Sequence, residues 1–300
     1  MNSLLSICDV KDDIENIINL ASDFKSGKIK EKPLKNKKLA MIFEKSSTRT
    51  RVSFEVGMYE LGGSALFLST NDLQIGRGEP IKDTAKVLSR YVDGIMIRAK
   101  KHSDVVELAE QSDIPVINGL TDLEHPCQAF ADMLTIKEHK GNFSGKLAFI
   151  GDGNNVSNSL LLISAYLGMD FALACPKGYE INEDIFKKGQ EIASKTGSEI
   201  IVSDDLELAL KDANIVYTDV WVSMGDEKES EKRYADFKPY QVNKESMKLA
   251  KKDAIFMHCL PAIRGQEVTS DVIDGEQSVI YDQAENRLHA QKAIMYHYLK

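Results

Sequence analysis

The sequence predicts an α/β fold of two doubly wound domains, each a mostly parallel sheet flanked by helices. Short apolar runs of strand length alternate with longer segments of helical periodicity, the pattern of parallel strands joined by crossover helices. The 300 residues exceed one average domain. A strand followed by a glycine-rich turn begins again at residue 146, as expected at the start of a second domain.

Composition and charge exclude several classes of protein. Hydrophobic residues make up 43% and charged residues 28% of the chain, as in ordinary globular proteins. The net charge of −8 argues against a general nucleic-acid binder, so an anionic substrate needs a local basic site. The chain begins without a signal-peptide pattern, and no run approaches the ~20 apolar residues of a membrane span. No membrane association is expected.

Cysteine usage indicates a reducing, cytoplasmic compartment. Cys8, Cys127, Cys175 and Cys259 are far apart and make no C-x-x-C pair. Because zinc and disulfide frameworks both depend on patterned spacing, neither a metal site nor a disulfide is expected.

In the first half, periodicity predicts a helix over 9–27, with Asp9 as its cap and Gly27 at its end. A basic linker, expected to be solvated, leads to the first strand. The predicted strands are 38–43, 64–68, 93–98 and 114–119, and the helices between and after them include 81–90, 103–111 and 129–139. Residues 69–80 are polar and glycine-rich, typical of a loop that can carry binding groups.

The junction between the strand 38–43 and the helix after it carries four hydroxyls and two arginines, in the run Ser46-Ser47-Thr48-Arg49-Thr50-Arg51. Ser and Thr are good helix N-caps, and the first turn of a helix offers unpaired N–H groups and the positive end of its dipole. Arginine adds forked donors that suit phosphate or carboxylate. A single hydroxyl here would indicate only a capped helix, whereas this density favours a phosphate site.

Two further strand ends carry polar residues. Arg98 ends a buried-type strand, where α/β sheets bind ligands, although a surface arginine paired with an acid is the alternative. His125 precedes Pro126, and Gln128 follows three residues after His125. Since proline suits the first position of a helix, His125 and Gln128 are expected to bracket a helix start and face one ligand.

The second half opens with the strand 146–150 and the sequence Gly151-Asp-Gly153, the beginning of a dinucleotide fingerprint. Val156 replaces the third glycine, and the next strand, 171–175, ends without an acid for a ribose. A doubly wound domain without NAD is therefore predicted. Its remaining elements are helices at 181–196 and 206–213, strands at 199–202, 214–219 and 254–257, and a long tail helix over 282–299.

Two strand ends of this half carry candidate groups. Asp219 ends a strand close to Trp221, and at this position it is a candidate for binding a ligand. The alternative is that Asp219 only forms a turn next to a tryptophan of the core. Cys259 follows another strand and could be a nucleophile or, more commonly, an inert thiol. The highly charged segment 226–238 is expected to be exposed.

Together these motifs resemble the aspartate/ornithine carbamoyltransferase family. The similarity rests on Ser-Thr-Arg-Thr-Arg at the phosphate junction, His-Pro-x-Gln from His125, Asp-x-x-x-Ser-Met-Gly from Asp219 and His-Cys-Leu-Pro from His258. The last two are typical of the ornithine branch. The resemblance covers nearly the whole chain in order.

The resemblance implies transfer of the carbamoyl group of carbamoyl phosphate to the δ-amine of L-ornithine, without cofactor or metal. Four residues would be catalytic: Arg98, His125, Asp219 and Cys259. Those implied to bind carbamoyl phosphate are Ser47, Thr48, Arg49, Thr50, Gln74, Arg98, His125, Gln128, Cys259, Leu260 and Arg287. Those implied to bind ornithine are Asn155, Asp219, Ser223 and Met224.

The resemblance also implies a domain organisation and an assembly. Residues 1–139 with a C-terminal helix at about 285–300 would bind carbamoyl phosphate, and 140–284 would bind ornithine, with the active site in the cleft between the domains. The family forms homotrimers or multiples of trimers, in which the loop of Gln74 reaches a neighbouring site. The resemblance implies a reaction of arginine metabolism, either in synthesis, as in arginine biosynthesis and the urea cycle, or in breakdown.

Three alternatives remain at this stage. A carbamoyltransferase for putrescine or another amine would differ near residues 219–225, and the intact Ser-Met-Gly argues against it. An NAD-dependent oxidoreductase would need the missing acid. A non-catalytic metabolite-binding protein is disfavoured because each expected reactive position is filled.

Overall fold

The computed structural model describes residues 3–222 and 229–300. The chain forms two compact units, one of residues 1–134 with 285–300 and the other of residues 135–284. Both boundaries fall within helices, α5 (Pro126–Lys140) and α12 (Ile280–Leu299), so each of these helices contributes residues to both units. Among the described residues, no helix is both long enough and apolar enough to cross a membrane.

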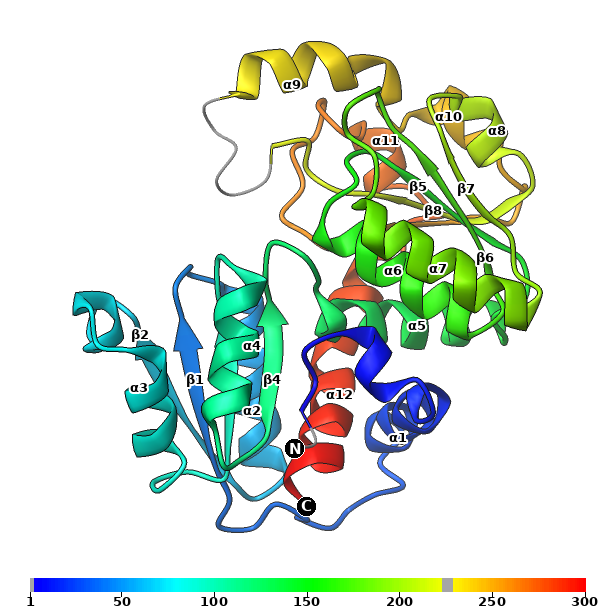
Figure 1. The fold of residues 1–300 in the computed structure, drawn as a ribbon. Coiled ribbons are helices and arrows are strands. Elements are labelled where there is room, and N and C mark those ends of the chain that lie inside the picture. Colours follow the sequence, from blue (N-terminus) through cyan, green and yellow to red (C-terminus); the bar gives the residue numbers. More distant parts are fainter. Residues whose placement is uncertain (1–2, 223–228) are drawn as a thin grey trace. The chain divides into compact units, whose positions relative to one another are not determined.

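The first unit is built on a four-stranded sheet in which every pairing is parallel (Figure 1). The strand order is β2-β1-β3-β4, so the chain reverses its direction of travel across the sheet between β1 and β3. The strands are β1 (Lys38–Phe43), β2 (Ser64–Ser69), β3 (Gly94–Arg98) and β4 (Val116–Leu120). The other elements wholly within this unit are η1 (Ile7–Val10), α1 (Ile14–Lys25), α2 (Thr48–Glu60), η2 (Ile75–Arg77), α3 (Ile81–Leu88) and α4 (His102–Gln111).

The core of this unit follows from the alternation of side chains along the strands. One face of β1 and β3 packs with α3 and α4 through a cluster that includes Ile42, Ile95 and Leu108. Elsewhere α2 approaches α12 closely at Gly57, where a Cβ atom would lie only 2.7 Å from the terminal methyl of Met295. The absence of a side chain at Gly57 therefore permits the C-terminal helix to pack on α2.

The N-terminal prediction was wrong in its boundaries. A single helix over 9–27 was expected, but η1 and α1 are separate and Asp13 occupies the N-cap position of α1. The Asp9 carboxylate instead accepts from the Ser6 N–H at 2.8 Å, in a capping box at the start of η1. Asp9 therefore caps the short helix η1 and not α1.

The second unit is built on a five-stranded sheet of order β7-β6-β5-β8-β9, again with only parallel pairings. The strands are β5 (Lys146–Ile150), β6 (Asp170–Ala174), β7 (Ile200–Ser203), β8 (Ala213–Thr218) and β9 (Ile255–His258). The helices of this unit are α6 (Asn155–Tyr166), α7 (Glu183–Thr196), α8 (Leu206–Leu210), α9 (Ser230–Phe237), η4 (Lys238–Tyr240), α10 (Lys244–Met247) and α11 (Ser270–Ile273).

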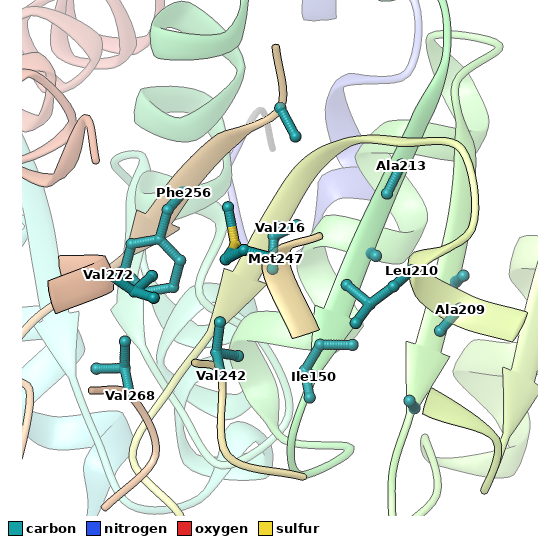
Figure 2. Packing of buried hydrophobic residues seen from close by; sticks show 14 of the residues in the cluster. Ile150, Ala209, Leu210, Ala213, Val216, Val242, Met247, Phe256, Val268 and Val272 are labelled. Carbon is teal, nitrogen blue, oxygen red and sulfur yellow. The ribbon is translucent and has the colours of Figure 1, made fainter. Parts of the chain in front are cut away.

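Figure 2 shows part of the hydrophobic core of this unit. Ile150, Val216 and Phe256 come from three neighbouring strands, and Leu210 and Met247 come from α8 and α10. The helix α6 is buried along most of its length and packs against α7 at Gly189, where a Cβ would meet Leu161 at 2.1 Å. Helices thus pack against this sheet, and the loops at its strand ends start from closely packed elements.

The predicted α/β fold with two parallel sheets is confirmed. The first and last residues of each predicted strand lie within two positions of those of an observed strand. The expectation of an exposed segment at 226–238 holds for most of its described part, with two exceptions. Residues 230–237 form α9, in which the Phe237 side chain is fully buried and Arg233 is only 9% exposed. These two residues face inward, which could not be predicted from a segment in which most side chains are charged.

Candidate active site

The predicted groups of the first unit lie in the loops after three neighbouring strands. The junction residues 47–50 follow β1, Arg98 ends β3, and His125 lies between β4 and α5. Because β1, β3 and β4 are adjacent and parallel, their carboxyl ends meet at one edge of the sheet. This edge includes the point between β1 and β3 where strand order reverses, the usual ligand position in doubly wound sheets.

The β1–α2 junction is the capped helix start that the sequence predicted. Ser47 is the N-cap of α2, and its hydroxyl oxygen accepts from the Thr50 N–H at 3.3 Å. The Ser47 hydroxyl also donates to Thr50 Oγ1 at 3.0 Å. Thr48 and Arg49 occupy the first turn, where backbone N–H groups and the dipole favour an anion.

Arg287 connects residues that are far apart in the sequence. Its guanidinium donates to Gln128 Oε1 at 2.7 Å and to Thr50 Oγ1 at 3.3 Å. Gln128 in turn donates from Nε2 to the fully buried Asp132 at 2.8 Å. The amide of Gln128 is therefore oriented at both ends, and Arg287 ties the start of α5 to the start of α2.

His125 lies in a strongly electropositive environment. Burial lowers the pKa of His125 well below its usual value of 6.5, and the charges of Arg287, Arg98 and Arg49 lower it further. Three arginines thus act on one buried imidazole, which stays neutral and can donate a hydrogen bond without adding charge. Such a concentration of cations suits a doubly charged anion.

This pKa shift predicts how stability depends on pH. Below pH 6.5 an unfolded His125 takes up a proton that the folded protein excludes, so the free energy of unfolding should fall as pH drops through this range. Urea unfolding between about pH 5 and 7.5 measures the slope. His125→Gln should flatten it, because the group that takes up the proton on unfolding is removed. An unchanged slope in His125→Gln would contradict the assignment.

Gln74 is not joined to this group. It precedes η2 in the exposed loop after β2, where its carbonyl accepts from the N–H groups of Arg77 and Glu79. Among the residues that the structure describes, no hydrogen bond links it to the arginine cluster. The role of Gln74 stays a prediction, in which its loop reaches the site of a neighbouring chain.

The predicted groups of the second unit also follow three neighbouring strands. Asn155 begins α6 after β5, Asp219 follows β8, and Cys259 with Leu260 follows β9. In this sheet β5, β8 and β9 are adjacent, with the reversal of strand order between β5 and β8.

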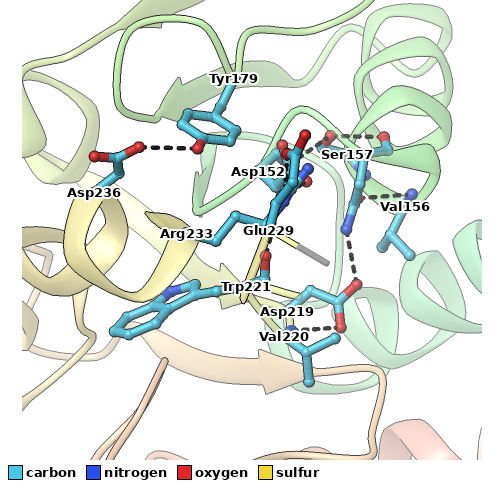
Figure 3. Close-up of polar contacts among 11 residues, drawn as sticks. Asp152, Val156, Ser157, Tyr179, Asp219, Val220, Trp221, Glu229, Arg233 and Asp236 are labelled. Atoms are coloured by element: carbon cyan, nitrogen blue, oxygen red, sulfur yellow. Dashed lines mark hydrogen bonds and ion pairs between the residues drawn. The ribbon is translucent and has the colours of Figure 1, made fainter. Parts of the chain in front are cut away.

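Asp219 is held by three hydrogen bonds, two of which are drawn in Figure 3. Its Oδ1 accepts from the Val220 N–H at 2.9 Å and from the Cys259 thiol at 3.1 Å. Its Oδ2 accepts from the Asn154 amide at 2.9 Å. Since the Cys259 S–H donates to a carboxylate, the arrangement suits a thiol that orients a neighbour rather than a covalent nucleophile.

Arg233 joins the loops on which these groups lie (Figure 3). It donates to the Asp152 carboxylate at 2.7 Å, in the turn after β5, and to the Trp221 carbonyl at 3.1 Å, in the turn after β8. Its guanidinium lies 5.0 Å from the centre of the Tyr179 ring. Arg233 therefore buttresses the two turns that carry Asn155 and Asp219.

A second buried pair supports Leu260. Nδ1 of His258 accepts from the Leu260 N–H at 2.9 Å, so the ring proton is on Nε2, which faces Glu267 at 3.2 Å. Glu267 also accepts from the Ile263 N–H at 2.6 Å. Leu260 has a φ of 58°, a left-handed conformation that is strained for a bulky residue and that these contacts maintain.

Asp219, His258 and Cys259 bring possible metal ligands within 4.8 Å of one another. Both ring nitrogens of His258 already have partners, however, so the imidazole would have to lose a hydrogen bond to bind a metal. The trio is better explained as a hydrogen-bonded support for the loop after β9.

The Gly-x-Gly turn has a structural explanation. A Cβ at Gly153 would lie 2.3 Å from the backbone of Glu180, and the Gly153 N–H donates to the Tyr179 carbonyl at 2.8 Å. The chain's own loop after β6 thus occupies the side from which a dinucleotide would approach the second glycine.

Sequence reasoning identified most of the clustered groups but missed their supports. Ser223 and Met224 lie outside the described residues. The supports that it missed are Asp132, Asn154, Arg233 and Glu267. The two adjacent asparagines after Gly153 were a usable signal for Asn154, since either could have been the cap of α6. The pairings of the other three depend on contacts distant in sequence.

Comparison with protein families gives two matches that together cover nearly the whole chain. Residues 2–138 match the family model described as aspartate/ornithine carbamoyltransferase, carbamoyl-P binding domain. Residues 144–298 match the model described as aspartate/ornithine carbamoyltransferase, Asp/Orn binding domain.

Individual proteins show the same similarity. A Methanobrevibacter smithii protein named ornithine carbamoyltransferase is 67% identical over 301 aligned positions that cover all of both chains. Among solved structures, ornithine carbamoyltransferase from Pyrococcus furiosus is 51% identical with a TM-score of 0.96, covering 99% of this chain and 97% of that one. The anabolic ornithine carbamoyltransferase from Campylobacter jejuni is 45% identical with a TM-score of 0.94, covering 98% of each chain.

Proposed function

This chain belongs to the aspartate/ornithine carbamoyltransferase family, and from that premise we propose how its residues carry out the reaction. The enzyme transfers the carbamoyl group of carbamoyl phosphate to the δ-amino group of L-ornithine, giving L-citrulline and phosphate. The observation that carries the residue assignment is the convergence of Arg49, Arg98 and Arg287 on the buried, neutral His125. Carbamoyl phosphate is the doubly charged anion that such a site suits.

The two substrates are assigned to different parts of the chain. Residues 1–139 with 285–300 bind carbamoyl phosphate, and residues 140–284 bind ornithine. The two compact units, which divide at 134/135 and 284/285, lie within five residues of these limits. The arginine cluster belongs to the first unit and Asp219 to the second, which supports the assignment.

Carbamoyl phosphate is bound by both of its ends. Ser47, Thr48, Arg49 and Thr50 receive the phosphate at the start of α2 through hydroxyls, guanidinium and backbone N–H groups. The carbamoyl end is bound by Arg98, His125 and Gln128. The residues that complete the proposed site are Cys259, Leu260 and Arg287, together with Gln74 from a neighbouring chain. Gln128 Oε1 has a second lone pair for the carbamoyl NH₂ while it accepts from Arg287.

Ornithine is bound by Asn155 and Asp219 together with Ser223 and Met224. The carboxylate of Asp219 suits an amino group of the substrate, because the diamino acid carries one more cation than a neutral amino acid. Cys259 and the Leu260 carbonyl complete the reacting region, and the buried His258–Glu267 pair supports them.

The chemical step is a nucleophilic acyl-type substitution. The lone pair of the neutral δ-amine forms a bond to the carbamoyl carbon, and the carbonyl oxygen becomes an oxyanion. Arg98 and His125 stabilise this oxyanion, which is usually the largest electrostatic contribution in such reactions. The bond from carbon to the phosphate oxygen then breaks, and the departing phosphate takes the proton of the amine.

Citrulline formation from carbamoyl phosphate tests the assignment of substrate. L-Ornithine should be carbamoylated, whereas L-aspartate, putrescine and N-acetyl-L-ornithine should give rates at least about 100-fold lower, because each lacks or alters a charged group that Asp219 and its neighbours recognise. Turnover of another acceptor at the ornithine rate would overturn the assignment of the second unit. It would leave the carbamoyl-phosphate site intact.

We propose a homotrimer, or a multiple of trimers, as the assembly. Support comes from apolar side chains exposed along α2, Val52, Val56 and the 75%-exposed Tyr59, and along the edge strand β2, Leu66 and Phe67. An exposed apolar edge strand usually requires cover. Light scattering should give about three times the chain mass of 33.5 kDa, or a multiple of it.

The biosynthetic role and the compartment are also proposals. The reaction makes citrulline, so we propose a role in arginine biosynthesis. The urea cycle uses the same reaction. The four cysteines all lie among the described residues and form no disulfide, which supports a reducing cytoplasm.

A further inference from the structure

We infer that Asn154 is a positioning residue for the second substrate, because its carboxamide fixes the direction in which the Asp219 carboxylate points. This inference rests on the proposed role of Asp219 in binding ornithine. Asn154 itself need not touch ornithine, unlike its neighbour Asn155.

Two sets of contacts fix the Asn154 side chain. Its Oδ1 accepts from the N–H groups of Val156 at 3.0 Å and Ser157 at 3.1 Å, which makes it the N-cap of α6. Its Nδ2 donates to Asp219 Oδ2 at 2.9 Å. The cap therefore anchors one end of the carboxamide to a buried helix, and the other end points at the carboxylate.

The orientation of this amide is determined by chemistry. A backbone N–H can only donate, so the atom that faces Val156 and Ser157 must be the oxygen. The NH₂ group must then face Asp219, where it can only donate. Reversing the amide would lose both cap bonds and place an oxygen against a carboxylate oxygen.

These hydrogen bonds fix the direction of the Asp219 carboxylate and leave part of its capacity to accept hydrogen bonds unused. Oδ1 has two donors, Val220 N–H and the Cys259 thiol, and Oδ2 has the Asn154 amide. A carboxylate offers about four acceptor positions. At least one on Oδ2 thus remains for an amino group of the substrate, at a position set by the Asn154 hydrogen bond.

Substitutions at Asn154 can separate this role from helix capping. Aspartate caps helices as well as asparagine does, so Asn154→Asp keeps the bonds to α6 but turns an acceptor toward Asp219. Serine also caps but is too short to reach the carboxylate, so Asn154→Ser removes the donor alone. Asn182→Asp is the matched control, because Asn182 caps α7 in the same way at an exposed position.

Steady-state kinetics of the full-length enzyme provide the test, with KM for each substrate and kcat measured separately. Asn154→Ser should lower kcat/KM for ornithine about 10- to 100-fold, the usual effect of losing a hydrogen bond to a charged group, and Asn154→Asp should lower it further. KM for carbamoyl phosphate should stay within about twofold, as should all parameters of Asn182→Asp. The melting temperature of Asn154→Ser should remain close to that of the wild type, because serine keeps the cap of α6 and adds no charge.

Two results would overturn the inference in different ways. If Asp219→Asn impairs ornithine use but Asn154→Asp behaves as the wild type does, Asn154 only caps α6 and the proposed role of Asp219 stands. If Asp219→Asn itself leaves KM for ornithine unchanged, the proposed role of Asp219 fails and the inference fails with it.

Discussion

Replacing Arg49 with alanine is expected to lower kcat/KM for carbamoyl phosphate by about 10²- to 10³-fold while the protein remains folded. Arg49 is the second residue of α2 after the Ser47 cap, and in the proposed site its guanidinium and the helix dipole act on the same phosphate. Its side chain is only partly buried, so its loss leaves no large cavity. Initial rates at varied carbamoyl phosphate measure the effect.

A second readout connects this variant to the site. The charge of Arg49 is one of the causes that lower the pKa of His125, so the pKa of His125 should rise in Arg49→Ala. An NMR titration of the imidazole detects this change. Arg90→Ala removes an exposed arginine of the same unit and should alter neither the rate nor the titration. Wild-type turnover in Arg49→Ala would refute the assigned phosphate site.

Asp219→Asn is expected to raise KM for ornithine by about 100-fold and to lower kcat, because the neutral amide loses the charge that receives an amino group. The substituted side chain also carries an NH₂ group. This group must face one of the three groups that donate to the Asp219 carboxylate in the wild type, which are the Val220 N–H, the Cys259 thiol and the Asn154 amide. KM for carbamoyl phosphate should hardly change, since the arginine cluster lies in the other unit.

Asp253→Asn is a suitable comparison for Asp219→Asn. Asp253 is exposed and pairs with Lys140 at 3.1 Å, away from the strand ends that carry Asp219 and Cys259. The same change of charge there should leave both KM values as they are. Equal effects of the two substitutions would mean that net charge, and not the site, controls ornithine binding.

Local sequence patterns predicted most of the secondary structure and a set of candidate functional residues at the strand ends. Apolar runs of strand length marked the strands of the described residues, and in central strands such as β3 burial of both faces explains the continuous hydrophobicity. Polar residues at strand ends, such as Arg98 and Asp219, stood out against these runs. Local rules predicted the capped start of α2 and Pro126 as the first residue of α5.

Which of these residues contact one another, and which groups hold them, follows from the packing of elements that are distant in the sequence. Arg287 reaches Thr50 across 237 positions of sequence, a pairing that no local pattern encodes. Arg233 looked like part of a solvated charged run, yet packing turned it inward to Asp152. Of two adjacent asparagines, the backbone direction at the start of α6 made Asn154 the cap that faces Asp219. Local periodicity sets elements, but the directions of polar side chains follow from how those elements pack.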